Sequence, residues 1–299
     1  MKILLAGANG QLGREICRSR LPSGVRLITA NRSQLDLTRP DDIAGFVRDA
    51  APDLVINAAA YTAVDKAELE PDLAFAVNRD GAAALAKAAA AQNAPIIHIS
   101  TDYVFDGRKD DFWVEEDRPN PINVYGESKL DGETAVIAAN ERHLIVRVSW
   151  LYASSGNNFL RNMLRLGRER SHLTIVKDQI GRPTSAADLA DALIGMALQT
   201  MNGQGEWGVY HFSNSGEPTS WHGFASAIFC YAARWSSMPP ILDPISTEDF
   251  GARAARPRNS RLDLGKIERI YGLRPRNWQA ALADVIEELR LEDTALRAS

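Results

Sequence analysis

Residues 1–13 read MKILLAGANGQLG, and this stretch decides the fold. A short apolar strand runs directly into three glycines, Gly7, Gly10 and Gly13, where a helix is expected to begin. Glycine permits a tight turn and close approach of the backbone to a pyrophosphate, while the helix N-terminus offers free N–H groups. The stretch therefore predicts a dinucleotide-binding turn. Its spacing is G-x-x-G-x-x-G, and the alternative is a turn that only connects strand to helix.

Short β-rich runs alternate with helical patterns through the first half of the chain. This alternation is typical of βαβ units and predicts an α/β fold, a Rossmann-type doubly wound parallel sheet with helices on both faces. Strands are expected at 3–6, 26–30, 54–57, 96–100 and 144–148, and helices at about 11–20, 41–50, 72–92 and 124–140.

After Trp150 the alternation of strands and helices becomes less regular, which indicates a smaller C-terminal substrate-binding lobe. We assign residues 1–150 to the dinucleotide-binding domain, joined by about 173–200, and residues 151–299 mainly to the lobe. The lobe should cover the carboxyl edge of the sheet, where ligands of such sheets bind. Within it, helices are expected at about 157–169, 186–200, 220–233, 263–271 and 278–291, and a strand at 209–212.

Composition narrows the classes of function. The formal net charge is −4 over 299 residues, so no basic field favours nucleic acid. The N-terminus lacks the apolar core of a signal peptide, and no apolar run approaches the length of a membrane span. We therefore expect a cytoplasmic protein that binds neither nucleic acid nor membrane.

Residues 125–129 read YGESK and carry the candidate chemistry. Tyr125 and Lys129 lie four apart and share a helix face, so an ammonium group would lower the pKa of the phenol. Tyr125 could then protonate a carbonyl oxygen as hydride arrives, with the hydroxyl of Thr101 donating to the same oxygen. Lys129 could also hold the nicotinamide ribose. Chance occurrence on a helix is the alternative, and the glycine turn argues against it.

The end of the second predicted strand indicates which cofactor is used. Residues 29–33 read TANRS and contain no carboxylate for a ribose 2′-hydroxyl, whereas Arg32 could meet a 2′-phosphate. The sequence thus predicts a preference for NADP(H), with NAD(H) still accepted. Asp36 and Leu37 are expected to line the adenine pocket, and the small residues at 57–60 allow the backbone to lie against the cofactor.

Several stretches resemble the dTDP-4-dehydrorhamnose reductases, a family of extended short-chain dehydrogenases/reductases. They are NAAAYTAVDKAE at 57–68, STDYVFDG at 100–107, NVYGESK at 123–129, RVSWLY at 147–152, DQIGRPT at 178–184 and RPRNS at 256–260. The resemblance implies NADP(H)-dependent reduction of dTDP-4-dehydro-6-deoxy-L-mannose at C4, giving dTDP-β-L-rhamnose.

The resemblance also implies roles for individual residues. Tyr125 would be the proton donor, with Lys129 and Thr101 assisting. The cofactor would contact Gly10, Gln11, Leu12, Asp36, Leu37, Ala60, Tyr61, Thr62, Tyr125 and Lys129, and the nucleotide sugar would contact Thr101, Asp102, Tyr103 and Trp150.

Charges outside these motifs give further candidates. The charge of a diphosphate must be met locally in an acidic chain, by helix-end amides or by arginines. The candidates are Arg182 and the arginine-rich loop at 252–261, especially Arg256 and Arg258, and the alternative for that loop is a solvated surface segment. Members of the family can bind Mg²⁺ at an association surface, which allows a homodimer. The matching carboxylates are Glu15, Asp188 and Glu288, although Asp188 stands where a longer glutamate is expected.

Two alternatives remain open at this stage. One is another nucleotide-sugar enzyme, a 4-epimerase or a 4-ketoreductase with different stereochemistry. The other is a non-catalytic subunit resembling the regulatory subunit of methionine adenosyltransferase. Retention of Thr101, Tyr125 and Lys129 together favours catalysis.

Overall fold

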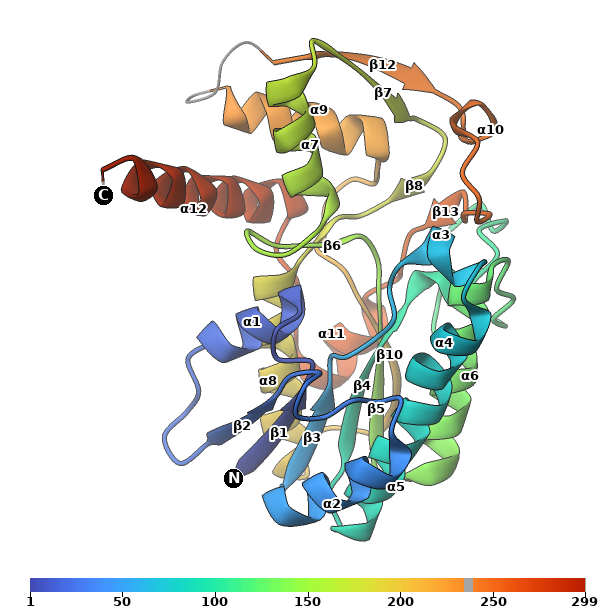
Figure 1. The fold of residues 1–299 in the computed structure, drawn as a ribbon, viewed down its shortest axis with the longest axis vertical. Helices are drawn as coiled ribbons and strands as arrows, with labels where there is room; N and C mark the ends of the chain where they lie inside the picture. Colours follow the sequence, from blue (N-terminus) through green and yellow to red (C-terminus); the bar gives the residue numbers. More distant parts are fainter. Residues whose placement is uncertain (234–238, 299) are drawn as a thin grey trace.

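A six-stranded parallel sheet forms the centre of the larger layer (Figure 1). The structure is a computed structural model and describes residues 1–233 and 239–298. The strand order is β10-β5-β4-β3-β1-β2, so the chain reverses direction of winding between β1 and β3. The α/β doubly wound prediction is confirmed. The strands are β1 (Lys2–Ala6), β2 (Arg26–Ala30), β3 (Leu54–Asn57), β4 (Ile96–Thr101), β5 (His143–Val148) and β10 (Gly208–Phe212).

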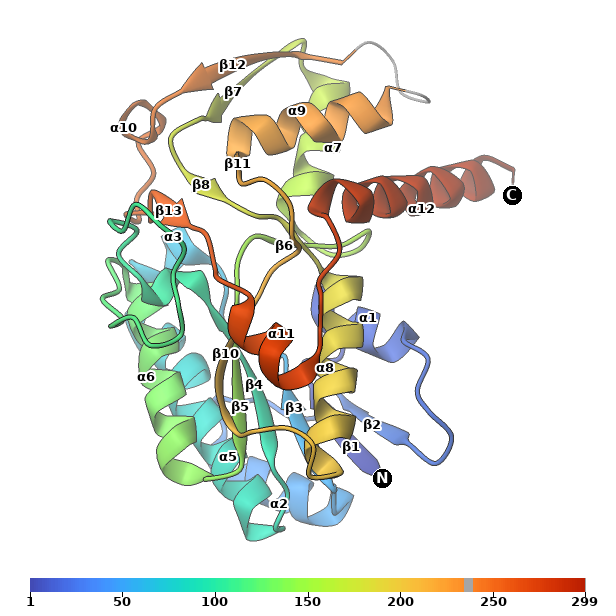
Figure 2. The ribbon, with the colours of Figure 1, turned by 180° about the vertical axis from the view of Figure 1, so that it is seen from behind.

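Helices cover both faces of this sheet (Figures 1 and 2). One buried cluster joins the sheet to α1 (Gln11–Arg18), α8 (Ala186–Met201) and α11 (Gly265–Tyr271). A second cluster joins the other face to α2 (Pro40–Ala50), α5 (Ala82–Ala91) and α6 (Val124–Ala139). Before α5 the chain forms α4 (Pro71–Phe75) and a π-helical turn, η1 (Ala76–Gly81).

The smaller lobe stands over the carboxyl ends of the strands (Figures 1 and 2). Its apolar core joins α7 (Phe159–Glu169), α9 (Trp221–Ala232) and α12 (Trp278–Ala298) to a two-stranded parallel ribbon of β7 (His172–Val176) and β12 (Ile241–Ile245). The remaining short elements are α3 (Val64–Ala67), η2 (Asp102–Val104), β6 (Leu151–Tyr152), β8 (Ile180–Gly181), β9 (Thr184–Ser185), β11 (Thr219–Ser220), α10 (Thr247–Phe250) and β13 (Asn259–Ser260).

The chain passes between the sheet layer, which is the central sheet with its covering helices, and the smaller lobe more than once. After entering the lobe at Leu151 it returns to the sheet layer for α8 and β10, and later for α11. Of the segment 173–200, which we predicted to join the sheet layer, only the α8 part packs there. Residues 173–176 belong to β7 and pair with β12 in the lobe. A short apolar run has the same appearance in sequence wherever it is buried.

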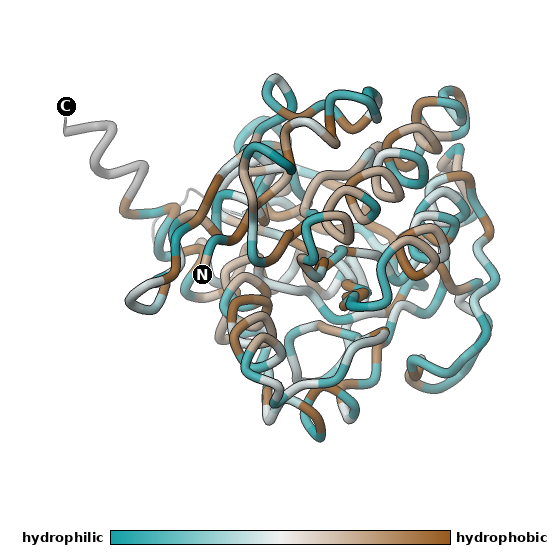
Figure 3. Tube along the Cα trace, turned by 90° about the horizontal axis from the view of Figure 1, so that it is seen from below, coloured by the Kyte–Doolittle hydropathy of each residue, from teal (hydrophilic) through white to brown (hydrophobic). Residues whose placement is uncertain are grey.

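Side-chain caps begin the helices around the junction of the layers. Asn123, Asn158, Ser185 and Ser220 each accept a backbone N–H from the first turn of α6, α7, α8 and α9 respectively. Hydrophobic and hydrophilic residues alternate along the peripheral helices (Figure 3). Over the described parts of the chain, no helix has both the length and the apolar character that a membrane span requires.

Candidate active site

The glycine turn connects β1 to α1. Gly7 has a φ of 83°, and a Cβ there would lie 2.8 Å from the backbone of Ala58. A Cβ on Gly13 would collide with the Gly7 carbonyl, whereas Gly10 is less crowded. The turn therefore requires glycine at Gly7 and Gly13, and it leaves the N-terminus of α1 open beside the end of β3.

A cavity of about 280 Å³ lies beside this turn. Arg32 lines it with a side chain that is 76% exposed, and its Nε lies 3.7 Å from Oδ2 of Asp36. Hydrogen bonds from the backbone and hydroxyl of Thr38 lower the pKa of Asp36, so this carboxylate partly offsets the charge of Arg32. Leu37, Ala60 and Tyr61 complete the predicted adenosine contacts in this cavity.

The loop after β3 is fixed by a residue that sequence reasoning missed. Asn78, in η1, accepts the backbone N–H of Tyr61 at 2.8 Å and donates to its carbonyl at 3.0 Å. The same Nδ2 donates to the hydroxyl of Ser128 on α6. A π-helical turn thus links the predicted cofactor loop to the helix that carries Tyr125 and Lys129.

A second cavity, of about 600 Å³, lies between the sheet edge and the lobe. The structure brings Thr101, Tyr125 and Lys129 together in its lining. Gly10, Gln11, Leu12, Ala60 and Thr62 line the same cavity from the cofactor side, and Asp102, Tyr103 and Trp150 line it from the lobe side.

Burial controls the ionisation of the two central groups. It raises the pKa of Tyr125 to about 12, although a hydrogen bond with Thr101 opposes this shift. It lowers the pKa of Lys129, which is 1% exposed, to about 8. We predicted that Lys129 would lower the pKa of the phenol. The structure shows the opposite direction, because desolvation raises this pKa most and the charge of Asp102 raises it further. Tyr125 therefore retains its proton at neutral pH.

The residues after β4 hold the hydroxyl of Thr101. Its Oγ1 accepts the backbone N–H of Tyr103 and donates to Oδ1 of Asp102, both at 3.1 Å. Burial raises the pKa of Asp102 to about 6. Since a hydroxyl has one hydrogen, Thr101 can donate either to Asp102 or to the phenol oxygen of Tyr125, but not to both at once.

Trp150 belongs both to the core of the lobe and to the cavity wall. Its ring stacks on Trp221 with centroids 3.7 Å apart, and it packs closely on Gly181. Its φ of 49° is rare for a bulky residue, and the hydrogen bond from the N–H of Thr184 to its carbonyl helps to hold this strained backbone. Trp221 was not foreseen, and an aromatic residue beginning a helix was the one available signal.

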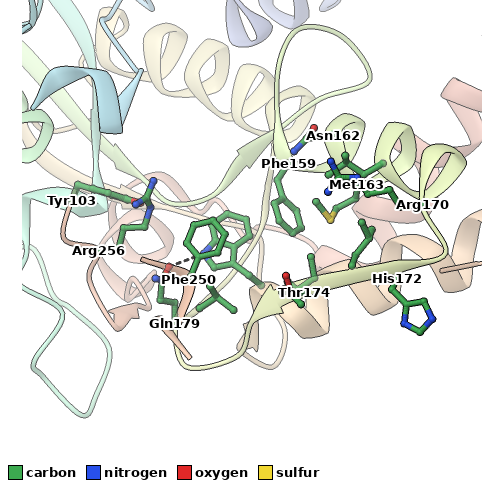
Figure 4. Close-up of a pocket in the computed structure, with 15 residues that line it drawn as sticks. Tyr103, Phe159, Asn162, Met163, Arg170, His172, Thr174, Gln179, Phe250 and Arg256 are labelled. Atoms are coloured by element: carbon green, nitrogen blue, oxygen red, sulfur yellow. Dashed lines mark hydrogen bonds between the residues drawn. The ribbon is translucent and has the colours of Figure 1, made fainter. Parts of the chain in front are cut away.

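A third cavity, of about 550 Å³, is built within the lobe (Figure 4). Tyr103 and Arg256 lie at one end, and Arg170 and His172 lie at the other. Arg256 is paired with Asp65 of α3, with Nη2 at 2.7 Å from the carboxylate. The wall between these ends is largely apolar and aromatic: Phe159, Met163, Leu166, Leu173, Ile175, Val176, Trp221 and Phe250.

Arg182 was predicted to meet a diphosphate, but it lines none of these three cavities. Its guanidinium lies 4.3 Å from the ring centroid of Phe112, and burial lowers its pKa. Its backbone carbonyl accepts the hydroxyl of Ser149. The cation–π contact directs this side chain away from the cleft.

The three predicted magnesium ligands do not form a single site. Arg18 contacts both Glu288, at 2.6 Å, and Glu15, at 3.4 Å, while Asp188 pairs with Arg276 at 2.9 Å. No cluster of three potential metal-ligating side chains occurs within 1–233 and 239–298. These carboxylates do not fit Mg²⁺ within one chain because each is already paired with a guanidinium group.

Comparisons with known proteins agree with this geometry. The family model "RmlD substrate binding domain" matches residues 1–291. The dTDP-4-dehydrorhamnose reductase of Sinorhizobium fredii is 44% identical, with 98% of this chain and 99% of the relative covered. Its counterpart from Escherichia coli K12 is 41% identical, with coverage of 97% and 98%.

Solved structures give the same result. A dTDP-4-dehydrorhamnose reductase from Clostridium acetobutylicum superposes with a TM-score of 0.91 at 39% identity, covering 97% of this chain and all 100% of that one. The enzyme of that name from Bacillus anthracis, solved in complex with NADP, gives a TM-score of 0.88 at 40% identity, covering 96% and 99%.

Proposed function

The chain belongs to the dTDP-4-dehydrorhamnose reductase family, and on that premise we propose that it reduces dTDP-4-dehydro-6-deoxy-L-mannose at C4 to dTDP-β-L-rhamnose in dTDP-rhamnose biosynthesis. It is a nicotinamide-dependent oxidoreductase. The observation that carries the proposal is the convergence of Thr101, Tyr125 and Lys129 on one cavity beside the glycine turn.

A nicotinamide cofactor fits the two cavities that flank the glycine turn. A side chain at Gly7 or Gly13 would collide with neighbouring backbone atoms, so both positions require glycine. Glycine at this turn also permits the close approach of a pyrophosphate to the backbone. Arg32 beside the first cavity supports a preference for a 2′-phosphorylated cofactor. When bound, the nicotinamide supplies the hydride that the reduction needs.

Tyr125 has the proton that the new alcohol requires. Its phenol stays protonated at neutral pH and lines the reacting cavity, so it can donate to O4 of the sugar as C4 accepts hydride. Thr101 orients the phenol through its hydrogen bond, and Lys129 would hold the nicotinamide ribose. The pair Asp102 and Trp150 forms the wall against which the deoxysugar ring lies.

The nucleotide end of the substrate fits the cavity within the lobe. An apolar and aromatic wall suits the thymine ring, and Trp221 lines both this cavity and the reacting one. The diphosphate would then pass Tyr103 and Arg256, where the two cavities approach each other. A homodimer remains a prediction from the sequence, and Mg²⁺ stays outside the proposal because Arg18 and Arg276 engage its supposed ligands.

The test is a coupled measurement with dTDP-4-dehydro-6-deoxy-L-mannose. Absorbance at the NADPH maximum reports oxidation of the cofactor, and NMR of the product reports the configuration at C4. We expect stoichiometric NADPH oxidation and the L-rhamno product. A product of the opposite C4 configuration would assign the chain to a different ketoreductase, and substrate isomerisation without net NADPH oxidation would assign it to the epimerases.

A further inference from the structure

The stacked indoles of Trp150 and Trp221 are both contacted by one short segment of the lobe, residues 178–181. The two rings lie nearly parallel, at 12°, with their centroids 3.7 Å apart. Nε1 of Trp221 donates to Oε1 of Gln179 at 3.1 Å (Figure 4). A Cβ on Gly181 would lie 2.7 Å from the ring of Trp150, so the backbone of this glycine packs against that indole. Residues 178–181 therefore limit where both rings can lie.

Strand pairing fixes Gln179 beside Trp221. Gln179 directly precedes β8, the central strand of the three-stranded sheet β11-β8-β13. β11 pairs with β8 through Thr219 and Ser220, and Trp221 follows at once as the first residue of α9. Gln179 is 3% exposed, so both ends of its amide need partners within the protein.

The orientation of the Gln179 amide follows from its other partner. The hydroxyl of Thr247, at the start of α10, donates to Oδ1 of Asp178 at 2.7 Å. A hydroxyl has one hydrogen, so toward Gln179 this oxygen can only accept, and Nε2 of Gln179 donates to it at 3.1 Å. The amide oxygen must then face Trp221, whose indole nitrogen only donates. The amide is therefore held with its acceptor toward the ring.

We propose that Gln179 is a positioning residue that sets the shape of the reacting cavity through Trp221. Its amide oxygen fixes the rotation of the Trp221 ring, and that ring supports Trp150 by stacking on it. Without the acceptor, the indole N–H would lose its partner and the ring would be free to turn out of the stack. The identity of the ligand, a dTDP-sugar, rests on the proposed function, whereas the hydrogen bond can be measured in the free protein.

The lining of the cavities shows why the effect must pass through Trp221. Gln179 lines the cavity within the lobe and not the reacting cavity, whereas Trp221 lines both. Trp150 lines the reacting cavity. The alternative role for Gln179 is direct contact between its amide and the nucleotide, from the wall of the cavity within the lobe. Only the positioning role requires the indole N–H of Trp221.

A double-mutant cycle separates the two roles. Gln179→Met keeps the length of the side chain and removes the acceptor, and Trp221→Phe keeps an aromatic ring and removes the donor. We expect Gln179→Met to raise KM for the dTDP-sugar and Kd for dTDP-β-L-rhamnose by about tenfold, the size of one hydrogen bond, with kcat changed by less than about threefold. In the Trp221→Phe background the same change should add less than about twofold.

Gln199→Met is the matched control. Nε2 of Gln199 also donates within the protein, to the carbonyl of Tyr271, but Gln199 lines none of the three cavities. This variant should leave KM for the dTDP-sugar and Kd for dTDP-β-L-rhamnose unchanged.

A second measurement needs no ligand and begins with the unmodified protein. Hydrogen exchange of the indole N–H groups, followed in ¹H–¹⁵N spectra, should show that of Trp221 to be protected, and Trp221→Phe identifies its signal. Gln179→Met should speed this exchange by about tenfold or more, whereas Gln179→Glu, which retains an acceptor oxygen, should keep it slow. Exchange of Trp221 at the rate of an exposed indole in the unmodified protein, or unchanged exchange in folded Gln179→Met, would overturn the proposal.

The binding results can overturn it as well. Unchanged affinity for the dTDP-sugar in folded Gln179→Met excludes the positioning role, and an equal loss in both backgrounds of the cycle assigns Gln179 to direct contact with the nucleotide. If the unmodified protein fails to oxidise NADPH with the dTDP-sugar, the proposed function fails, and the exchange measurement still decides whether Gln179 holds Trp221.

Discussion

Tyr125→Phe separates proton donation from every other role of this side chain. The change removes one hydroxyl and keeps the ring, which packs edge-on against Tyr103 with centroids 5.5 Å apart. Packing and cavity shape should survive, so the loss falls on the chemical step. General acid catalysis typically contributes about 10²–10⁴-fold, and we expect kcat to fall by at least about a hundredfold, or ~3 kcal/mol in the barrier.

Tyr103→Phe is the matched control. It removes a hydroxyl from the partner ring of the same aromatic pair, at the side of the cavity that faces Arg256. We expect this variant to raise KM for the dTDP-sugar while kcat changes less than about tenfold. NADPH affinity, measured by fluorescence titration, should be largely kept in both variants. Near-normal kcat in Tyr125→Phe, or an equal kcat loss in both, would refute Tyr125 as the proton donor.

Four further predictions follow from the same geometry. Trp150→Ala should both raise KM for the dTDP-sugar and lower stability by roughly 3–5 kcal/mol in urea unfolding, and destabilisation with unchanged KM would remove the substrate role. Arg256→Ala should weaken competitive inhibition by dTDP. The sequence led us to expect the same of Arg258, but its side chain is 76% exposed and lines none of the three cavities, so Arg258→Ala serves as the control and should leave inhibition unchanged; equal effects would contradict this. Arg32→Ala should raise KM for NADPH and leave NADH nearly unchanged, and equal losses with both cofactors would show that Arg32 faces elsewhere. Asp102→Asn should stabilise the protein at pH 7.5 by about 1–3 kcal/mol, because burial raises the pKa of the folded carboxyl to about 6. Burying this group in its charged form lowers the free energy of unfolding; this loss is absent below the unfolded pKa of 3.8 and complete above pH 6. The gain should shrink at pH 4, and a gain that is equal at both pH values would contradict it.

The elements of the sheet layer could be predicted because each carries a local signal. The apolar run of β1 ends in glycines whose absence of a side chain the turn requires, and the strands at 26–30 and 54–57 have the predicted bounds. The lobe could not be predicted to the same depth. Its ribbon joins β7 to β12 across some seventy residues of chain, and nothing in either short run indicates its partner.

The residues of the candidate site also separate into those that the sequence could predict and those that it could not. Tyr125 and Lys129 were predictable as a pair because helical spacing alone brings them to one face. Trp221 and Asn78 were not, since each acts through a contact with a distant segment: the ring of Trp150 for one and the loop at Tyr61 for the other. Arg182 had the right charge for a diphosphate but is held by an aromatic ring that only the fold brings near it.

The direction of the Tyr125 pKa was also beyond the reach of the sequence, and its physical cause explains how the pair works. Burial desolvates both groups at once. Desolvation disfavours charge, so it raises the pKa of the phenol and lowers that of the amine. The two shifts oppose the expectation of a phenolate beside an ammonium and instead favour a neutral phenol beside a readily deprotonated lysine. A phenol that keeps its proton until a carbonyl oxygen gains negative charge is the form that reduction requires, because a phenolate has no proton to give.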